Sequence, residues 1–312
     1  MQSPKPFARI GTRGSPLALA QARLVRALLC GTHGVAEDEI VITVLSTGGD
    51  RSQAENITLS DIGGKGVFTK EIDDALLTGA IDIGVHSSKD VATGLPPGMV
   101  LAAFLEREDV RDAFISVNAR DIDSLPDNAR FGTSSIRRAA QARRLRPDLR
   151  IVPFRGNVHT RLQKLLDGVA DATLLALAGL NRLGEAHRAT AILDADAFMP
   201  APAQGAIGLA IREGDQHFAN IVAPLDHSAT HAEINAERAM LAVLDGSCRT
   251  PVGALTRRNG DMLTLKGEIL SLDGQTTFRA EASGIDPAAL GEAVGKDLLA
   301  QAGADWQSRF LS

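Results

Sequence analysis

The residue best suited to covalent chemistry is Cys248, in the glycine-flanked stretch Gly246-Ser247-Cys248-Arg249. A thiolate is the strongest nucleophile that a protein offers at neutral pH, and a neighbouring positive charge favours the thiolate form. A free cysteine can equally be a small buried hydrophobic residue, and the residue types alone leave both roles open. Cys248 is therefore the first candidate for a covalent attachment.

A second cluster, His86-Ser87-Ser88-Lys89-Asp90, directly follows the apolar run at residues 81–85. Ligands bind beyond the carboxyl ends of strands in open α/β sheets. Placed there, Asp90 could protonate a departing amine or stabilise a developing positive charge. A solvated loop with a local Lys89–Asp90 pair is the alternative that the motif leaves open.

Residues 130–164 hold ten basic residues against one acidic residue. Ser135, Arg137 and Arg138 follow a Gly-Thr turn at the start of a predicted helix, where N–H groups and guanidinium groups converge on anions. Arg155 follows a predicted strand in the same way. We interpret the arginines at the end of the same helix, Arg143, Arg144 and Arg146, as a solvated face.

The arginine-rich stretch has few aromatic residues between its arginines, which argues against single-stranded nucleic acid as its ligand, because such ligands stack on aromatic side chains. Several carboxylates on one small molecule fit it better. The turn at residues 11–15 adds Arg13. Residues 63–66, Gly-Gly-Lys-Gly, lack the phosphate-loop spacing and are interpreted as a lid over a cleft.

Composition limits the class of protein. The chain has 312 residues, 44% hydrophobic and 23% charged, which predicts a globular protein of two or three domains. A net charge of −5 argues against general nucleic-acid binding. No apolar stretch approaches the roughly 18–20 residues of a membrane span, and residues 1–9 lack the apolar core of a secretory signal, so we expect a cytoplasmic protein. We expect no disulfide between Cys30 and Cys248 and no metal site.

The elements that must position these residues alternate between strand and helix. The first group has strands at residues 9–12, 40–45 and 81–85, a helix at 68–77, and a helix that begins at Ser15-Pro16 and ends at Gly31. The second has strands at 113–117, 151–154 and 172–176 and a helix at 157–166. Residues 206–211 form a strand that returns to the first group.

The character of the chain changes after residue 229. A helix through residue 244 precedes strands at 252–256, 263–270 and 276–282 and a last helix at 288–300. This order predicts a separate α+β domain with an antiparallel sheet.

Seven segments, in this order, resemble the porphobilinogen deaminase family. Each motif alone is weak, but the ordered set is specific, and the likeness spans nearly the whole chain. The segments are residues 9–19 (RIGTRGSPLAL), 64–71 (GKGVFTKE), 86–91 (HSSKDV), 106–113 (EREDVRDA), 132–138 (GTSSIRR), 155–158 (RGNV) and 246–248 (GSC).

The resemblance implies two α/β domains like those of periplasmic binding proteins, followed by a C-terminal α+β domain with a three-stranded antiparallel sheet. The expected boundaries are residues 1–105 with 205–225 for domain 1, 106–204 for domain 2 and 226–312 for domain 3.

The implied activity is that of a transferase in tetrapyrrole biosynthesis, including porphyrin and haem. It joins four porphobilinogen molecules head to tail into hydroxymethylbilane and releases ammonia at each step. The implied cofactor is one dipyrromethane per chain, held by a thioether to Cys248. The implied partner is the small-molecule substrate, with no nucleic acid, no membrane and a monomeric chain.

Carried over by position, Asp90 would be the catalytic carboxylate, binding pyrrole N–H groups and stabilising the azafulvenium cation. The positions that match cofactor-binding residues are Lys89, Asp90, Ser135, Arg137, Arg138 and Arg161, besides Cys248. Those that match substrate-binding residues are Arg13, Ser15, Lys65, Arg155 and Arg182. Asp61 stands where some members carry a lysine, which weakens the case for a second loop lysine. A two-lobed binding or sensor protein is the competing interpretation, but it leaves Cys248 without a task.

Overall fold

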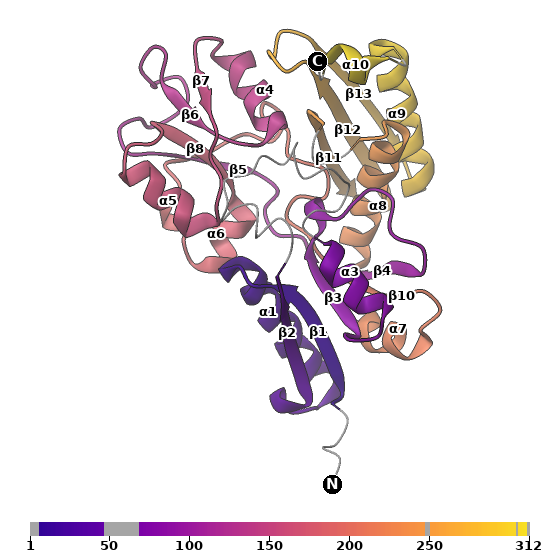
Figure 1. Ribbon diagram of the computed structural model, residues 1–312. Helices are drawn as coiled ribbons and strands as arrows, with labels where there is room; N and C mark the ends of the chain where they lie inside the picture. The colour runs from indigo at the N-terminus through magenta and orange to yellow at the C-terminus, as the bar shows by residue number, and fades with distance from the viewer. Residues whose placement is uncertain (1–5, 47–68, 247–249, 304, 311–312) are drawn as a thin grey trace. The chain divides into compact units, whose positions relative to one another are not determined.

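The computed structural model describes residues 6–46, 69–246, 250–303 and 305–310 (Figure 1). The chain forms two compact units. The first comprises residues 1–107 and 206–231, and the second comprises residues 108–205 and 232–312. Each unit is described by itself below.

The first unit is built on a mixed five-stranded sheet in the order β2-β1-β3-β10-β4. Its strands are β1 (Ala8–Arg13), β2 (Ile40–Leu45), β3 (Ile83–Ser87), β4 (Met99–Phe104) and β10 (Ile207–Arg212). β1 pairs in parallel with β2 and β3, whereas β10 lies antiparallel between β3 and β4. The predicted return of residues 206–211 to this sheet is confirmed.

Helices cover both faces of this sheet. Val25 and Leu29 of α1 (Pro16–His33) pack on one face with α7 (Gln216–Val222), and Ile72 and Leu76 of α3 (Lys70–Leu77) pack on the other. Single turns are η1 (Glu37–Glu39), η2 (Ser88–Asp90) and η4 (Ala223–Leu225).

The predicted end of α1 at Gly31 is wrong. The helix continues to His33 and ends at Gly34, whose φ of 67° is left-handed and whose N–H donates to the carbonyl of Cys30. Glycine adopts this left-handed conformation without steric cost. The helix therefore ends at Gly34, which has the left-handed φ, and not at Gly31, which stays helical.

The second unit contains two sheets. The first has the order β7-β6-β8-β5-β9, with β6 parallel to β7 and β8, and β5 antiparallel to β8 and β9. Its strands are β5 (Asp112–Ser116), β6 (Arg130–Gly132), β7 (Arg150–Val152), β8 (Ala172–Ala176) and β9 (Ala191–Ile192). Its helices are α4 (Ile136–Leu145), α5 (Val158–Leu166), α6 (Leu177–Leu183) and the turn η3 (Ala186–Arg188).

Two successive residues of β5, which point to opposite faces of the sheet, show that both faces are buried. Phe114 joins the apolar cluster that includes Ala142 of α4, and Ile115 joins the one that includes Leu165 of α5 and Leu180 of α6. The expected strands and helices of both α/β parts are present, but α6, α7, β4 and β9 are additional. α6 follows β8 without a turn signal, so the apolar run hides the change from strand to helix.

The other sheet of the second unit is the predicted three-stranded antiparallel one, which confirms that prediction. It consists of β11 (Val252–Asn259), β12 (Met262–Leu270) and β13 (Thr277–Gly284). The helices of this region are α8 (Ser228–Val243), α9 (Pro287–Ala302) and α10 (Trp306–Phe310). Met240, Leu265 and Leu298 share one buried cluster with Trp306.

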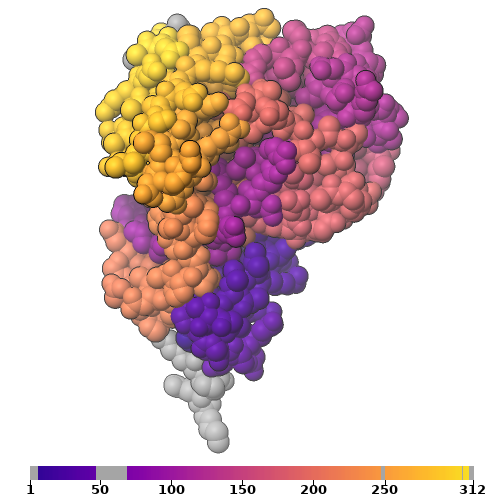
Figure 2. Space-filling model, turned by 180° about the vertical axis from the view of Figure 1, so that it is seen from behind, coloured from indigo at the N-terminus to yellow at the C-terminus, as the bar shows by residue number. Residues whose placement is uncertain are grey.

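Two of the arginines interpreted as a solvated face hold α4 against this three-stranded sheet. Arg144 forms an ion pair of 2.9 Å with the fully buried Glu268 of β12, and Arg143 donates to the carbonyl of Leu272 at 2.8 Å. In the space-filling view the surface of the C-terminal segment (yellow) continues into that around α4 (magenta) (Figure 2). The interpretation as a solvated face is therefore wrong for Arg143 and Arg144. Arg146 pairs with Asp148 at 2.7 Å.

The three-domain division stays a prediction, because the two parts of the second unit pack as one compact group. None of the described helices is both long and apolar enough to cross a membrane.

Two helical glycines offer a matched test of packing. A Cβ on Gly291 of α9 would lie 2.6 Å from the Cβ of Ala239 and closer still to the carbonyl of Ala236, whereas one on Gly31 of α1 would meet no atom within 4 Å. We expect Gly291→Ala to destabilise the protein by about 1–3 kcal/mol through overpacking, and Gly31→Ala to stabilise it by about 0.5–1 kcal/mol. Urea unfolding measures both changes. Equal effects of the two variants would contradict the close α8–α9 packing.

Candidate active site

In the first unit the predicted site residues gather at the carboxyl edge of the sheet. β1 and β3 are parallel neighbours, so the turn after Arg13 and the segment Ser87 to Asp90 emerge side by side. Ser15 begins α1 there, and its hydroxyl accepts a hydrogen bond from the N–H of Ala18 at 3.2 Å.

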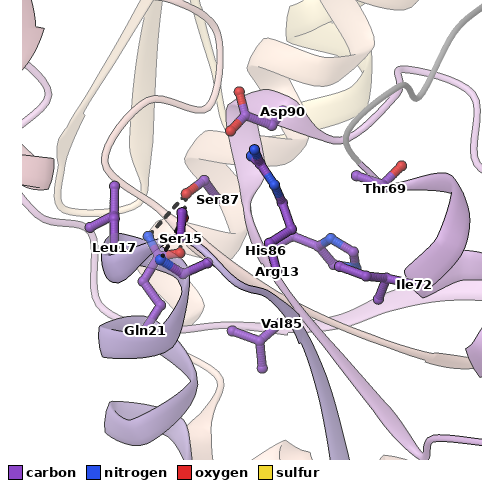
Figure 3. Close-up of a pocket in the computed structure, with 11 residues that line it drawn as sticks. Arg13, Ser15, Leu17, Gln21, Thr69, Ile72, Val85, His86, Ser87 and Asp90 are labelled. Atoms are coloured by element: carbon purple, nitrogen blue, oxygen red, sulfur yellow. Dashed lines mark hydrogen bonds between the residues drawn. The ribbon is translucent and has the colours of Figure 1, made fainter. Parts of the chain in front are cut away.

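These two segments form a pocket with a cavity volume of about 70 Å³ (Figure 3). Arg13 extends from β1 toward Asp90 at its mouth. Gln21 and Ser87 close the wall beside Ser15 through hydrogen bonds of 3.0 and 3.1 Å. The lining residues are Arg13, Ser15, Leu17, Ala18, Gln21, Thr69, Ile72, Val85, His86, Ser87 and Asp90. The structure therefore brings Arg13, Ser15 and Asp90 together, and Lys89 precedes Asp90 in the same turn.

A buried pair lies in the wall of this pocket. Nε2 of His86 is 4.0 Å from Oδ1 of Asp73, and neither atom has a hydrogen-bond partner among the described residues. The other carboxylate oxygen of Asp73 accepts from the hydroxyl of Thr69 at 2.8 Å. Burial raises the pKa of Asp73 to about 6, and burial together with the charge of Arg13 lowers the pKa of His86 to about 4.

In the second unit the predicted arginines follow the carboxyl ends of three neighbouring strands, β7, β6 and β8. Ser135 begins α4 after β6 and accepts from the N–H of Arg138. The N–H of Phe154, after β7, donates to the hydroxyl of Ser134 at 3.0 Å and so ties the two turns together. In the second turn, Nε of Arg161 donates to the carbonyl of Gly156 at 2.9 Å, which ties that guanidinium to the backbone of the turn.

Arg137 and Arg138 are buried rather than presented on the surface, at 4% and 6% exposure. Both pair with Asp112, at 2.9 and 2.8 Å. Burial alone would raise the pKa of Asp112, but the charges of Arg138 and Arg137 and their hydrogen bonds hold it well below its ordinary value. Burial lowers the pKa of Arg137, and Asp112 opposes that shift.

Arg182, at the end of α6, donates to the carbonyl of Gly205. Burial lowers the pKa of this guanidinium, and the charge of Glu108 opposes the shift. Arg182 thus makes one hydrogen bond to the connector at residues 199–205 through Nη2.

Two predicted residues, Cys248 and Lys65, lie outside the described residues, as do Asp61 and the glycine loop. Among the residues that are described, no cluster of three or more His, Cys, Asp or Glu side chains is arranged to hold a metal ion.

Two solved structures are similar to part of this chain. Similar arrangements occur in a periplasmic substrate-binding protein of an ABC transporter from Coxiella burnetii (14% identity, TM-score 0.44, 74% of this chain and 97% of that one). The methionine-binding protein MetQ is similar at 12% identity, with a TM-score of 0.44, 74% of this chain and 94% of that one. Within the described residues, two mixed five-stranded sheets packed with helices and one three-stranded antiparallel sheet define an α/β protein with a C-terminal α+β part.

Comparison of sequences gives the family. Residues 8–220 match the family model "Porphobilinogen deaminase, dipyromethane cofactor binding domain", and residues 231–300 match "Porphobilinogen deaminase, C-terminal domain". The porphobilinogen deaminase of Nitrobacter hamburgensis is 52% identical over 306 residues, 97% of this chain and 96% of the relative. That of Paracoccus denitrificans is 51% identical over 298 residues, 96% of this chain and 94% of the relative. The chain belongs to the porphobilinogen deaminase family.

Sequence reasoning missed the partners of the predicted residues. Asp112 lies in the motif at residues 106–113, directly before an apolar strand, and that position is the one signal of its burial in the sequence. Asp73 gives no signal, because its neighbours Glu71 and Asp74 suggest an ordinary acidic helix turn. His86 belongs to the same motif as Asp90, and its residue type alone indicates no role there.

The His86–Asp73 pair predicts two opposed pH dependences of stability. His86, with a folded pKa of about 4 against 6.5, loses its stabilisation as pH falls through that interval. Asp73, with a folded pKa of about 6 against 3.8, gains stabilisation as pH falls through its interval. Between about pH 6 and 4 the two contributions cancel in the wild type.

Replacing either residue of the pair leaves the pH dependence that the other contributes to stability without compensation. Relative to wild type, His86→Gln should gain free energy of unfolding as pH falls from 6 to 4.5, and Asp73→Asn should lose it, by up to about 1.4 kcal/mol per pH unit. Urea unfolding at a series of pH values measures the slopes, and the double variant should run parallel to wild type. Parallel slopes for both single variants would refute the assigned shifts.

Proposed function

We propose that this protein condenses four porphobilinogen molecules head to tail into hydroxymethylbilane, releasing ammonia at each step. The proposal is supported by family membership and by near-full-length identity to relatives named porphobilinogen deaminase. The single structural observation that carries it is the carboxylate of Asp90 at the mouth of a pocket that also presents Arg13.

Asp90 is suited to stabilise a cation. Within residues 6–46, 69–246 and 250–303, no group donates a hydrogen bond to its carboxylate, so its charge is not committed to an internal partner. When ammonia leaves the aminomethyl group of the substrate, positive charge develops on the pyrrole. A carboxylate at about 4 Å stabilises such a charge by roughly 4 kcal/mol at an effective dielectric constant near 20.

The arginines serve the carboxylates of the pyrroles. Each porphobilinogen unit carries two carboxylates, and guanidinium groups bind these in paired hydrogen bonds. Arg13 and Ser15 would orient the substrate beside Asp90. Arg155 and Arg182 would take carboxylates in the second unit, and Lys65 belongs to the same proposed set.

The residues present fit a dipyrromethane. Arg137 and Arg138 together carry one positive charge more than Asp112 neutralises, and the buried Nε of Arg137 has no acceptor among the described residues. Cys248 would hold the group covalently, and Lys89, Ser135, Arg137, Arg138 and Arg161 would bind its carboxylates. When bound, it supplies the pyrrole carbon to which the first substrate unit is joined.

The proposal extends to the three domains with their expected boundaries and to a cytoplasmic monomer without nucleic-acid or membrane partners. The three separate sheets support the division into domains. The net charge of −5 supports the absence of a nucleic-acid partner.

Intact mass tests the attachment. We expect the purified protein to carry a covalent increment equal to a dipyrromethane, because Cys248 holds the group by a thioether. The increment should be absent in Cys248→Ser and retained in Cys30→Ser, the matched control at the other cysteine. An unmodified wild type with ligand binding but no turnover would favour the two-lobed binding protein instead.

Kinetics test Asp90. We expect Asp90→Asn to lower turnover by about 100-fold or more, because the variant keeps the shape but loses the charge that stabilises the cation. Its folded state and mass increment should remain. Asp74→Asn, at an exposed position of α3, is the matched control and should leave turnover unchanged. Full turnover in Asp90→Asn would remove Asp90 from the mechanism.

A further inference from the structure

Asp112 is a buried carboxylate to which the chemistry above gives no part. It is fully buried at the first position of β5, opposite Ala176 at the last position of β8. This register places it at the same sheet edge as the turns that carry the arginines.

Three side chains converge on this one carboxylate. Arg138 binds it through two nitrogens, Nη2 at 2.8 Å to Oδ1 and Nε at 3.1 Å to Oδ2. Arg137 donates to Oδ2 at 2.9 Å. The amide of Gln204 donates to Oδ1 at 2.8 Å and also to the carbonyl of Val110. Four hydrogen bonds on one buried carboxylate leave it little freedom to move.

Asp112 also restricts the planes of both guanidinium groups. Arg138 is held on its other side by the carbonyl of Leu174 at 3.0 Å. Arg137 is held by the carbonyl of Met199 at 2.6 Å and lies 5.9 Å from the ring of Phe198. Arg137 keeps Nε without an acceptor among the described residues. Long arginine side chains lose much rotamer entropy when they become ordered on binding a ligand. Because each of these guanidinium groups is already held at two points, that entropy is lost on folding and not on ligand binding.

The same contacts reach the connector at residues 199–205. The carbonyl of Met199 accepts from Arg137 and also from the amide of Gln141, the latter at 2.9 Å. Ala203, with a left-handed φ of 61°, donates its N–H to the buried Glu237 at 2.6 Å. Gln204 brings the connector directly to Asp112. The connector leads into β10, the strand that completes the sheet of the first unit.

We propose that Asp112 is a positioning residue. By binding Arg137, Arg138 and Gln204 together, it presets the arginines that receive the ligand's carboxylates and fixes the connector beside them. This inference rests on the proposed function, because it concerns how that ligand is received. It assigns Asp112 no contact with substrate or cofactor and no part in the reaction itself.

The first test is Asp112→Asn, which keeps the shape of the side chain and removes its charge. The matched control is Asp171→Asn, which removes another bidentate aspartate–arginine contact, with Arg130, from the same sheet. In folded Asp112→Asn we expect the fraction of molecules carrying the mass increment to fall about tenfold or more, because Arg137 and Arg138 receive the carboxylates of the dipyrromethane, with KM of the loaded molecules for porphobilinogen changed less. Asp171→Asn should leave KM and the loaded fraction at wild-type values.

A purely structural role would lower the folded fraction but leave the loaded fraction of the folded molecules unchanged. A wild-type loaded fraction in folded Asp112→Asn would therefore overturn the proposal. The wild type separates this failure from failure of the proposed function, since without turnover or increment in the wild type it is the function that is wrong.

If Asp112→Asn does not fold, Gln204→Met decides the matter. It removes one donor from Asp112 and leaves both arginines in place. We expect the fraction of folded molecules carrying the mass increment to fall about threefold or more and amide hydrogen exchange in residues 199–205 to become faster. A wild-type loaded fraction together with wild-type exchange would overturn the proposal.

Discussion

The parallel pairing of a few strands is the constraint on which the candidate site residues of each unit depend. Because β1 and β3 run the same way, Arg13 and Asp90 reach one edge of the first sheet. Because β6 runs parallel to β7 and β8, the turn that carries Arg155 and the starts of α4 and α6 lie at one edge of the second sheet. Residues distant in sequence thus become neighbours through backbone hydrogen bonds alone, before any side chain contributes.

Charge burial is the second organising feature. The arginines needed for a polycarboxylate are too many to be left unpaired in a protein interior, and the fold pairs them selectively. Asp112 neutralises one of two buried guanidinium charges, and Glu268 pairs with Arg144 under the three-stranded sheet. Arg137 and Arg138 thus retain one positive charge beyond that of Asp112, and because an unpaired buried charge is costly, this excess would favour an anionic ligand.

The order of elements could be predicted from the sequence, because strand periodicity and helix caps are local signals, and motif order indicated the family; the roles of Asp90 and the arginines stay predictions. The sequence could not show that Arg143 and Arg144 bind the C-terminal sheet, since their acceptors lie more than 120 residues away. It placed the end of α1 at Gly31 because composition does not reveal which glycine adopts a positive φ. The partnership of His86 with Asp73 likewise depends on packing between α3 and β3.

The position of β10 has a consequence for the order in which the protein can form. β10 lies between β3 and β4, yet it is made only after the whole segment from residue 108 to 205. On the ribosome, β4 cannot join its sheet until residue 212 has emerged, so the α/β part of the second unit is synthesised while the first is still incomplete. Such non-local pairing slows folding and leaves strand edges exposed meanwhile. The first unit is thus the first whose synthesis starts and among the last whose fold can be completed.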